Sequence, residues 1–95
     1  MAQLNVIVRD KTGAPVADQL VTLNTFDAAD WGKPGIPINP NPRRTGSDGG
    51  VNFYNGPQLA APVMVQGTAQ NGTTEPVTFD GSTDVTVSVT LIPFV

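Results

Sequence analysis

The chain has 95 residues, with 5 Lys and Arg against 8 Asp and Glu, and it contains no cysteine and no histidine. The lack of cysteine removes disulfides and thiolate chemistry, and the lack of histidine removes the commonest general base and zinc ligand. The mildly acidic balance argues against a surface that tracks nucleic-acid phosphates, because such a surface needs clustered positive charge.

The length predicts one domain, residues 1–95, with a small core. Residues 1–5 lack the charged and apolar regions of a secretory signal, and the longest apolar run is too short to span a bilayer. These features favour synthesis and assembly in a cytoplasm. A domain excised from a longer extracellular protein remains the alternative.

The first elements are read from alternation of apolar and polar residues. Residues 4–9 place Leu4, Val6 and Val8 on one face, which predicts a half-buried strand. The cluster 10–15 then predicts a turn, and the alternation resumes in a second strand over 19–25. Together with later turn clusters, this pattern predicts an antiparallel β scaffold.

The alternation stops over residues 26–44, where Pro and Gly are frequent. These residues are Gly32, Pro34, Gly35, Pro37, Pro40 and Pro42. A connection of this length in a compact domain is more often functional than idle, and its prolines favour extended backbone. We expect a semi-rigid loop with an interaction role.

The second half of the chain predicts four more short strands. They cover residues 50–54, 62–69, 76–79 and 85–91, separated by clusters of turn-forming residues. The last strand alternates strictly, with aliphatic residues facing in and hydroxyl residues facing out. Six or seven short strands at such spacing predict a two-sheet sandwich.

Two motifs carry a family likeness. Residues 6–16 join a β-branched run to a turn, and residues 45–53 join a turn to another strand. With the strand around 21–23, they resemble the carboxypeptidase regulatory-like group of prealbumin-like and immunoglobulin-like β-sandwiches. The resemblance implies an all-β, Greek-key two-sheet sandwich of about seven short strands, with an accessory, adhesive or structural role.

Catalytic relatives of that group differ from this chain. Transthyretin-like hydrolases need histidines and a C-terminal Tyr-Arg-Gly-Ser, whereas this chain has no histidine and ends at 92–95 in Ile-Pro-Phe-Val. Isopeptide-forming pilin modules need a Lys on the first strand, where this chain has Arg9. The sequence also looks like small accessory proteins of bacteriophage virions, such as capsid decoration or tail proteins.

Several side chains could carry chemistry, and each has a plainer reading. Asp27, Asp30 and Asp48 could supply oxygen ligands to Ca²⁺, but their spacing matches no stereotyped site and favours turn carboxylates. Ser47 and Thr45 have no base to activate them. We therefore predict that the chain has no catalytic, metal or cofactor site and that it is not an enzyme.

Aromatic and basic residues suggest a binding surface. Trp31, Phe26 and Tyr54 could form a stacking platform, although single aromatics more often cap the end of a sandwich core. The Arg43–Arg44 doublet could bind carboxylates or remain solvated charge. The candidate partner-binding residues are Trp31, Ile36, Ile38, Arg43, Arg44 and Phe94.

These features predict a non-enzymatic structural or interaction protein. The expected setting is a virion, where the chain binds a multivalent protein lattice without nucleic acid, membrane or cofactor; self-association is left open. The alternative is a carbohydrate-binding or adhesive module that stacks sugars on Trp31 and Tyr54, located outside the cell or at its surface as part of a longer protein.

Overall fold

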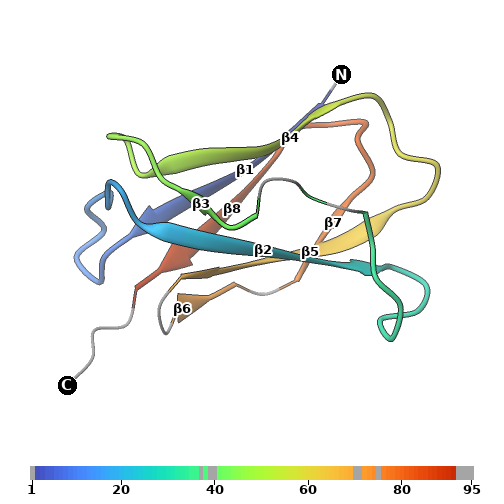
Figure 1. Ribbon diagram of the computed structural model, residues 1–95, viewed down its shortest axis with the longest axis horizontal. Helices are drawn as coiled ribbons and strands as arrows, with labels where there is room; N and C mark the ends of the chain where they lie inside the picture. Colours follow the sequence, from blue (N-terminus) through green and yellow to red (C-terminus); the bar gives the residue numbers. More distant parts are fainter. Residues whose placement is uncertain (1, 37, 39–40, 70–71, 75, 92–95) are drawn as a thin grey trace.

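The computed structural model describes residues 2–36, 38, 41–69, 72–74 and 76–91, and over these the chain forms strands and no helix (Figure 1). The strands are β1 (Ala2–Arg9), β2 (Leu20–Asp27), β3 (Arg43–Arg44), β4 (Gly50–Gly56), β5 (Val63–Ala69), β6 (Gly72–Thr73), β7 (Val77–Phe79) and β8 (Val85–Thr90). Accordingly, no helix that could cross a membrane is found in this part of the chain.

The strands form two sheets. One has the order β4-β1-β8, and the other has the order β3-β2-β5-β6, with β7 also paired to β5. Because β6 pairs with the end of β5 and β7 with its start, β6 and β7 are two pieces of one interrupted edge strand. The predicted all-β, two-sheet sandwich of about seven strand positions is confirmed.

The core lies between the sheets and follows the predicted alternation. Leu4, Val6 and Val8 of β1 are fully buried. Val21 and Leu23 of β2 and Val87 and Val89 of β8 are also buried, with exposed fractions of 2% or less. The buried apolar residues are Ala2, Leu4, Val6, Val8, Val21, Leu23, Phe53, Val63, Val65, Ala69, Phe79, Val87 and Val89. Along the long strands, burial therefore follows a period of two, and the largely β-branched buried residues form the face that points into the core.

One strand pairing differs from the predicted antiparallel scaffold. β1 and β8 run parallel, with Leu4 opposite Val85 and Arg9 opposite Thr90. Alternation has the same period in parallel and antiparallel strands, so the sequence pattern does not distinguish the two. The parallel pair joins the first and last described strands, with β1 in the centre of the sheet and β8 at its edge.

A β-bulge in β4 also changes the predicted pattern. The β1–β4 register shifts between Leu4 and Asn5, so both Phe53 and Tyr54 contact the core. The Tyr54 ring meets Phe79 edge to face, with ring centroids 5.5 Å apart. Its hydroxyl donates a hydrogen bond to the Pro57 carbonyl at 2.7 Å. The Tyr54 ring is therefore partly buried against the sandwich core.

The two turn motifs meet at one end of the sandwich, on the left in Figure 1. The Val8 N–H donates to the Gly49 carbonyl at 2.8 Å, and the Val16 N–H donates to the Val8 carbonyl at 3.0 Å. Gly49 has φ of +79°, and a Cβ there would lie 2.8 Å from the Val8 oxygen and 2.9 Å from Pro15. Only glycine fits this junction without displacing backbone.

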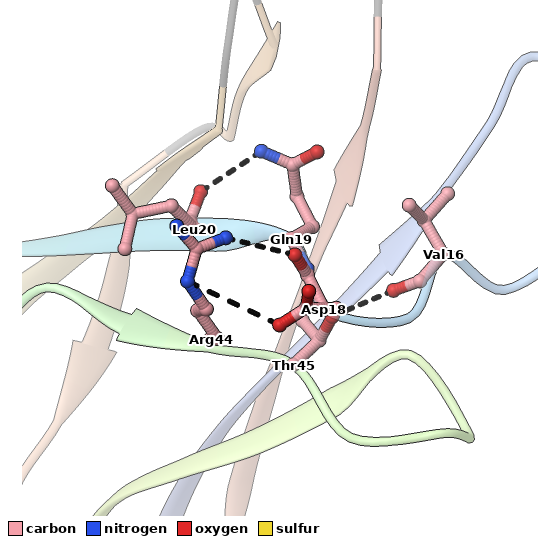
Figure 2. Close-up of polar contacts among 6 residues, drawn as sticks. All are labelled: Val16, Asp18, Gln19, Leu20, Arg44 and Thr45. Carbon is pink, nitrogen blue, oxygen red and sulfur yellow. Dashed lines mark hydrogen bonds and ion pairs between the residues drawn. The ribbon is translucent and has the colours of Figure 1, made fainter.

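Thr45 holds the same junction from the other sheet (Figure 2). Its buried hydroxyl donates to the Val16 carbonyl at 2.7 Å and accepts the Gln19 N–H at 2.9 Å. The Thr45 backbone bonds Gln19 and Asp18 at 2.9 and 3.0 Å. Arg44 adds a 3.0 Å hydrogen bond from its guanidinium to the Asp18 carbonyl. These contacts fix where the chain enters β2 and leaves β3.

Replacing Gly49 tests this junction. We expect Gly49→Ala to lower the free energy of unfolding by about 2 kcal/mol or more, because it adds a backbone clash to the strain of positive φ. Gly13 is a matched control, since it has φ of +88° but open space around a Cβ. Gly13→Ala should cost about 1 kcal/mol in urea denaturation. Equal losses in the two variants would contradict a close packing role for Gly49.

Two turn carboxylates are stabilised in their charged form. The Thr12 hydroxyl, aided by the Thr12 and Ala14 N–H groups, holds the pKa of Asp10 below its ordinary value of 3.8. The Ser82 hydroxyl and N–H lower the pKa of Asp80 in the same way. Both groups therefore favour the folded state when they are ionised.

This effect predicts a loss of stability in acid. A carboxyl whose folded pKa is depressed contributes stability above its unfolded pKa, and the contribution disappears as the pH falls through the folded pKa. Thermal melting of the wild type should therefore fall below about pH 4. The double variant Asp10→Asn with Asp80→Asn should show a shallower fall. Melting curves with identical pH dependence for both proteins would refute this assignment.

Candidate binding surface

The predicted loop over 26–44 is shorter in the structure and is anchored to the edge of β2. β2 continues to Asp27, and Arg43–Arg44 form β3, so the expected boundaries were too wide. The Asp27 N–H donates to the Lys33 carbonyl at 3.1 Å, and the Gly35 N–H donates to the Thr25 carbonyl at 3.1 Å. The loop thus follows the strand that precedes it.

Asn41 continues this anchoring with its side chain. Its Nδ2 donates to the Leu23 carbonyl at 2.7 Å, and its Oδ1 accepts the Leu23 N–H at 3.1 Å. The amide of Asn41 therefore occupies the place that a backbone peptide of a neighbouring strand would take. Covering an open strand edge in this way limits pairing with other chains. This segment is not a free recognition arm.

Most of the predicted partner-binding residues have contacts within the protein. Ile36 and Ile38 are half-buried and pack against the core. Arg43 Nη1 donates to the Asn52 carbonyl at 2.7 Å, and its guanidinium lies 6.0 Å from the Phe53 ring centroid, which ties β3 to β4. Arg44 contacts Asp18, as described above. Phe94 lies outside the described residues.

Trp31 is different, because a rigid turn presents it to solvent. The Asp27 carboxylate accepts the Ala29 N–H at 2.8 Å, and the Asp30 carboxylate accepts the Gly32 N–H at 3.0 Å. Such Asx turns fix the backbone on both sides of Trp31. The Trp31 side chain is nevertheless 56% exposed, more than the other large apolar residues of the described chain.

The indole lies over the outer face of the sheet that contains β2. Trp31 and Phe26 stack with ring centroids 6.4 Å apart and an interplanar angle of 15°. Phe26 pairs across strands with Met64, whose sulfur accepts the Thr78 hydroxyl at 3.2 Å. We call residues 26–33 the aromatic turn. Of the possible platform of Trp31, Phe26 and Tyr54, the structure brings Trp31 and Phe26 together, whereas the Tyr54 ring packs against Phe79 of the core.

The sheet surface beside the aromatic turn is uncharged and polar. Asn24 lies opposite Gln66, and Thr22 lies opposite Thr68, on strands β2 and β5. Gln66 donates a hydrogen bond to the Thr74 carbonyl at 3.0 Å. Within the described residues, the Asn24 amide has no hydrogen-bond partner. We call Thr22, Asn24, Phe26, Met64, Gln66 and Thr68 the outer face.

Open depressions lie on the surface formed by the described residues. One of about 250 Å³ adjoins the aromatic turn, and its lining includes Pro34, Ile36, Leu59 and Pro62. Another, of about 390 Å³, lies on the β4-β1-β8 sheet around Ile7, where Gly50 leaves space in the facing position. Neither depression contains a cluster of acidic residues.

The carboxylates considered as possible metal ligands accept hydrogen bonds from backbone N–H groups within turns. Asp48 accepts the Gly50 N–H at 2.9 Å, and Asp27 and Asp30 bond their own turn, as the plainer reading predicted. No group of three or more His, Cys, Asp or Glu that could hold a metal occurs among the described residues. The hydroxyl of Thr45, for which the sequence offers no activating base, is buried and bonds two backbone groups.

No family model matches this sequence, and no curated protein is significantly similar to it. The structure itself is compatible with an immunoglobulin-like sandwich, because its strands form two facing sheets that share one core. Membership of the carboxypeptidase regulatory-like group and an origin in a bacteriophage remain hypotheses.

The stacking of Trp31 with Phe26 was one reading of the sequence, whereas the turn that brings the two rings together was not predicted. A signal was present, since Asp27 and Asp30 precede Gly32 at the spacing of two consecutive Asx turns. Such turns reverse the chain and bring Trp31 back over the strand end. The anchoring role of Asn41 has no comparable signal, because it depends on a partner 18 positions away in the chain.

Two substitutions within residues 26–44 distinguish a side chain on the surface from one that packs on the core. We expect Trp31→Ala to change the free energy of unfolding by less than about 1 kcal/mol, as for exposed side chains. Ile36→Ala should cost about 1 to 3 kcal/mol, because it removes apolar contacts with the core. Urea denaturation measures both values. A larger loss for Trp31→Ala would assign Trp31 to the fold.

Proposed function

We propose that the protein is a non-enzymatic structural or interaction protein that binds a protein partner through the aromatic turn. The observation that carries the proposal is the rigid exposure of Trp31 over Phe26. Aromatic residues held in this way supply contact area at a low entropic cost, because their backbone is ordered before binding. Trp is also enriched among the residues that dominate interface energies.

The neighbouring surface supports a compact contact. Met64 lies opposite Phe26, and the apolar depression lined by Pro34 and Leu59 adjoins the turn. A partner side chain could therefore be buried beside the indole without rearranging the loop. The small area of this patch favours weak single contacts that become effective when many copies bind one assembly.

The proposed setting is a bacteriophage virion, in which the chain would act as a capsid decoration or tail component. The resemblance of residues 6–16 and 45–53 to accessory β-sandwich modules motivates this setting. A surface lattice also presents repeated copies of one partner site, as weak multivalent binding requires.

Co-sedimentation with assembled particles tests the proposal. The wild type should be retained in stoichiometric amounts, and Trp31→Ala should bind at least tenfold more weakly, in line with an interface residue that contributes over 1 kcal/mol. Leu20→Ala is a matched control, because Leu20 is 44% exposed at the other end of the same strand. Wild-type protein that never sediments with particles, or Trp31→Ala that binds like wild type, would refute the proposal.

A carbohydrate-binding role is the second candidate. It is favoured by the uncharged outer face beside Trp31, where Asn24 and Gln66 offer amides next to an aromatic ring. Neutral sugars are bound by stacking on such rings and by hydrogen bonds to amides and hydroxyls. Tyr54 is not part of this surface.

A glycan array distinguishes the second candidate from the first. Binding should require both the ring and the amide, so Trp31→Ala and Asn24→Ala should each remove the signal while Leu20→Ala keeps it. Absence of glycan binding by the wild type would remove this candidate and leave the protein-binding proposal unaffected.

A further inference from the structure

The edges of the two sheets are protected unequally. β3 has two residues, and the rest of that side of β2 is covered by Asn41 and the 33–36 segment. The opposite edge is divided into the short strands β6 and β7. The side of β4 away from β1 is crossed by the bond from Arg43 to Asn52. β8 is the long edge strand among the described strands that none of these devices covers, except at its Thr90 end, where Gly72 of β6 lies close to it.

The backbone of β8 presents specific groups at this edge. The Leu91 N–H donates to the Arg9 carbonyl at 2.8 Å, and Arg9 lies opposite Thr90 in the parallel register. In a parallel pair, alternate residues bond the neighbouring strand, so the odd-numbered residues of β8 bond β1 and the even-numbered ones face away. Gly72 of β6 lies so close to the Thr90 carbonyl that a Cβ would collide with it. Thr86 and Ser88 therefore offer the free backbone groups.

The β8 edge also lacks the usual obstacles to pairing. Its six residues contain no charge and no proline, and its register with β1 is continuous. Natural edge strands normally carry Lys, Pro, a bulge or a covering segment that prevents pairing with another chain. An uninterrupted and uncharged edge is a template for a further strand.

We propose that β8 pairs antiparallel with β8 of a second copy of this chain. Pairing around Val87 would place Thr86 of each copy opposite Ser88 of the other, where their backbone groups exchange hydrogen bonds. Their hydroxyl side chains would meet on the solvent side, an arrangement that stabilises antiparallel pairs. Val87 is buried, so the two cores would approach at the symmetry axis.

Charge complementarity favours a second copy of this chain as the partner that pairs with the β8 edge. Arg9 and Asp84 lie at opposite ends of the β1–β8 pair, and both are exposed on its solvent side. An antiparallel arrangement brings the Arg9 end of one copy next to the Asp84 end of the other. Arg9 has no ion pair within the described residues, and Asp84 accepts the Gln3 N–H at 2.8 Å. Two symmetric attractions would therefore flank the pairing.

This inference does not depend on the proposed function, but it would extend it. A dimer joined at β8 presents two aromatic turns, which lie on the other sheet of each copy. Binding of the second turn would then be intramolecular and would raise the apparent affinity for a repetitive surface.

Sedimentation over a range of concentrations tests the pairing. The wild type should shift from monomer to dimer as its concentration rises. Ser88→Pro should remain monomeric with nearly unchanged melting, because proline removes an N–H that does not bond β1. Ser88→Ala is the matched control and should dimerise. A wild type that stays monomeric at millimolar concentration, or Ser88→Pro that dimerises like wild type, would overturn the proposal.

Amide hydrogen exchange provides a second measurement at the residues themselves. The Thr86 and Ser88 amides should become at least tenfold better protected as the protein is concentrated. The double variant Thr86→Lys with Ser88→Lys keeps the backbone but opposes like charges, so it should abolish this protection, even if Ser88→Pro fails to fold. Exchange that is independent of concentration at both amides would refute pairing through β8.

Discussion

The fold depends on the contact between Val8 and Gly49. At this point, β1 bonds the turn before β4 with its N–H and the segment before β2 with its carbonyl, so one residue fixes both sheets at the same end. Thr45 closes the junction from the side of β3. The two motifs that dominate the sequence are thus two halves of one structural unit, although more than 30 positions separate Val8 from Thr45 and Gly49.

The two surfaces proposed for binding lie away from that end. The aromatic turn lies at the far end of β2, and β8 forms an edge of the opposite sheet (Figure 1). Neither feature contributes to the Val8–Gly49 junction, and Trp31 does not belong to the core. A scaffold that is held at one end can therefore vary the surface at the other end with little loss of stability.

Local chemistry explains which parts of the structure the sequence could predict. Alternation identified the inward residues of β1, β2 and β8, and the turn cluster at 10–15 identified the reversal at Gly13, because these signals lie within a few residues. The inward turn of Tyr54 depends on a bulge defined against β1, and the cover on β2 depends on Asn41. Such features require the tertiary pairing before any residue pattern reveals them. Among the candidate site residues that the structure describes, Trp31 alone is exposed and held by a turn, whereas Ile36, Ile38 and Arg43 have structural contacts.

The side-chain bonds of Asn41 also affect how the protein behaves in solution at high concentration. A covering strand is secured by many backbone bonds, whereas the middle of the β2 edge is shielded by a single amide with one donor and one acceptor in use. Brief detachment of that amide would uncover Leu23, in a strand whose neighbouring positions are largely apolar or hydroxyl-bearing. The chemical identity of one exposed side chain therefore sets the resistance of this edge to aggregation.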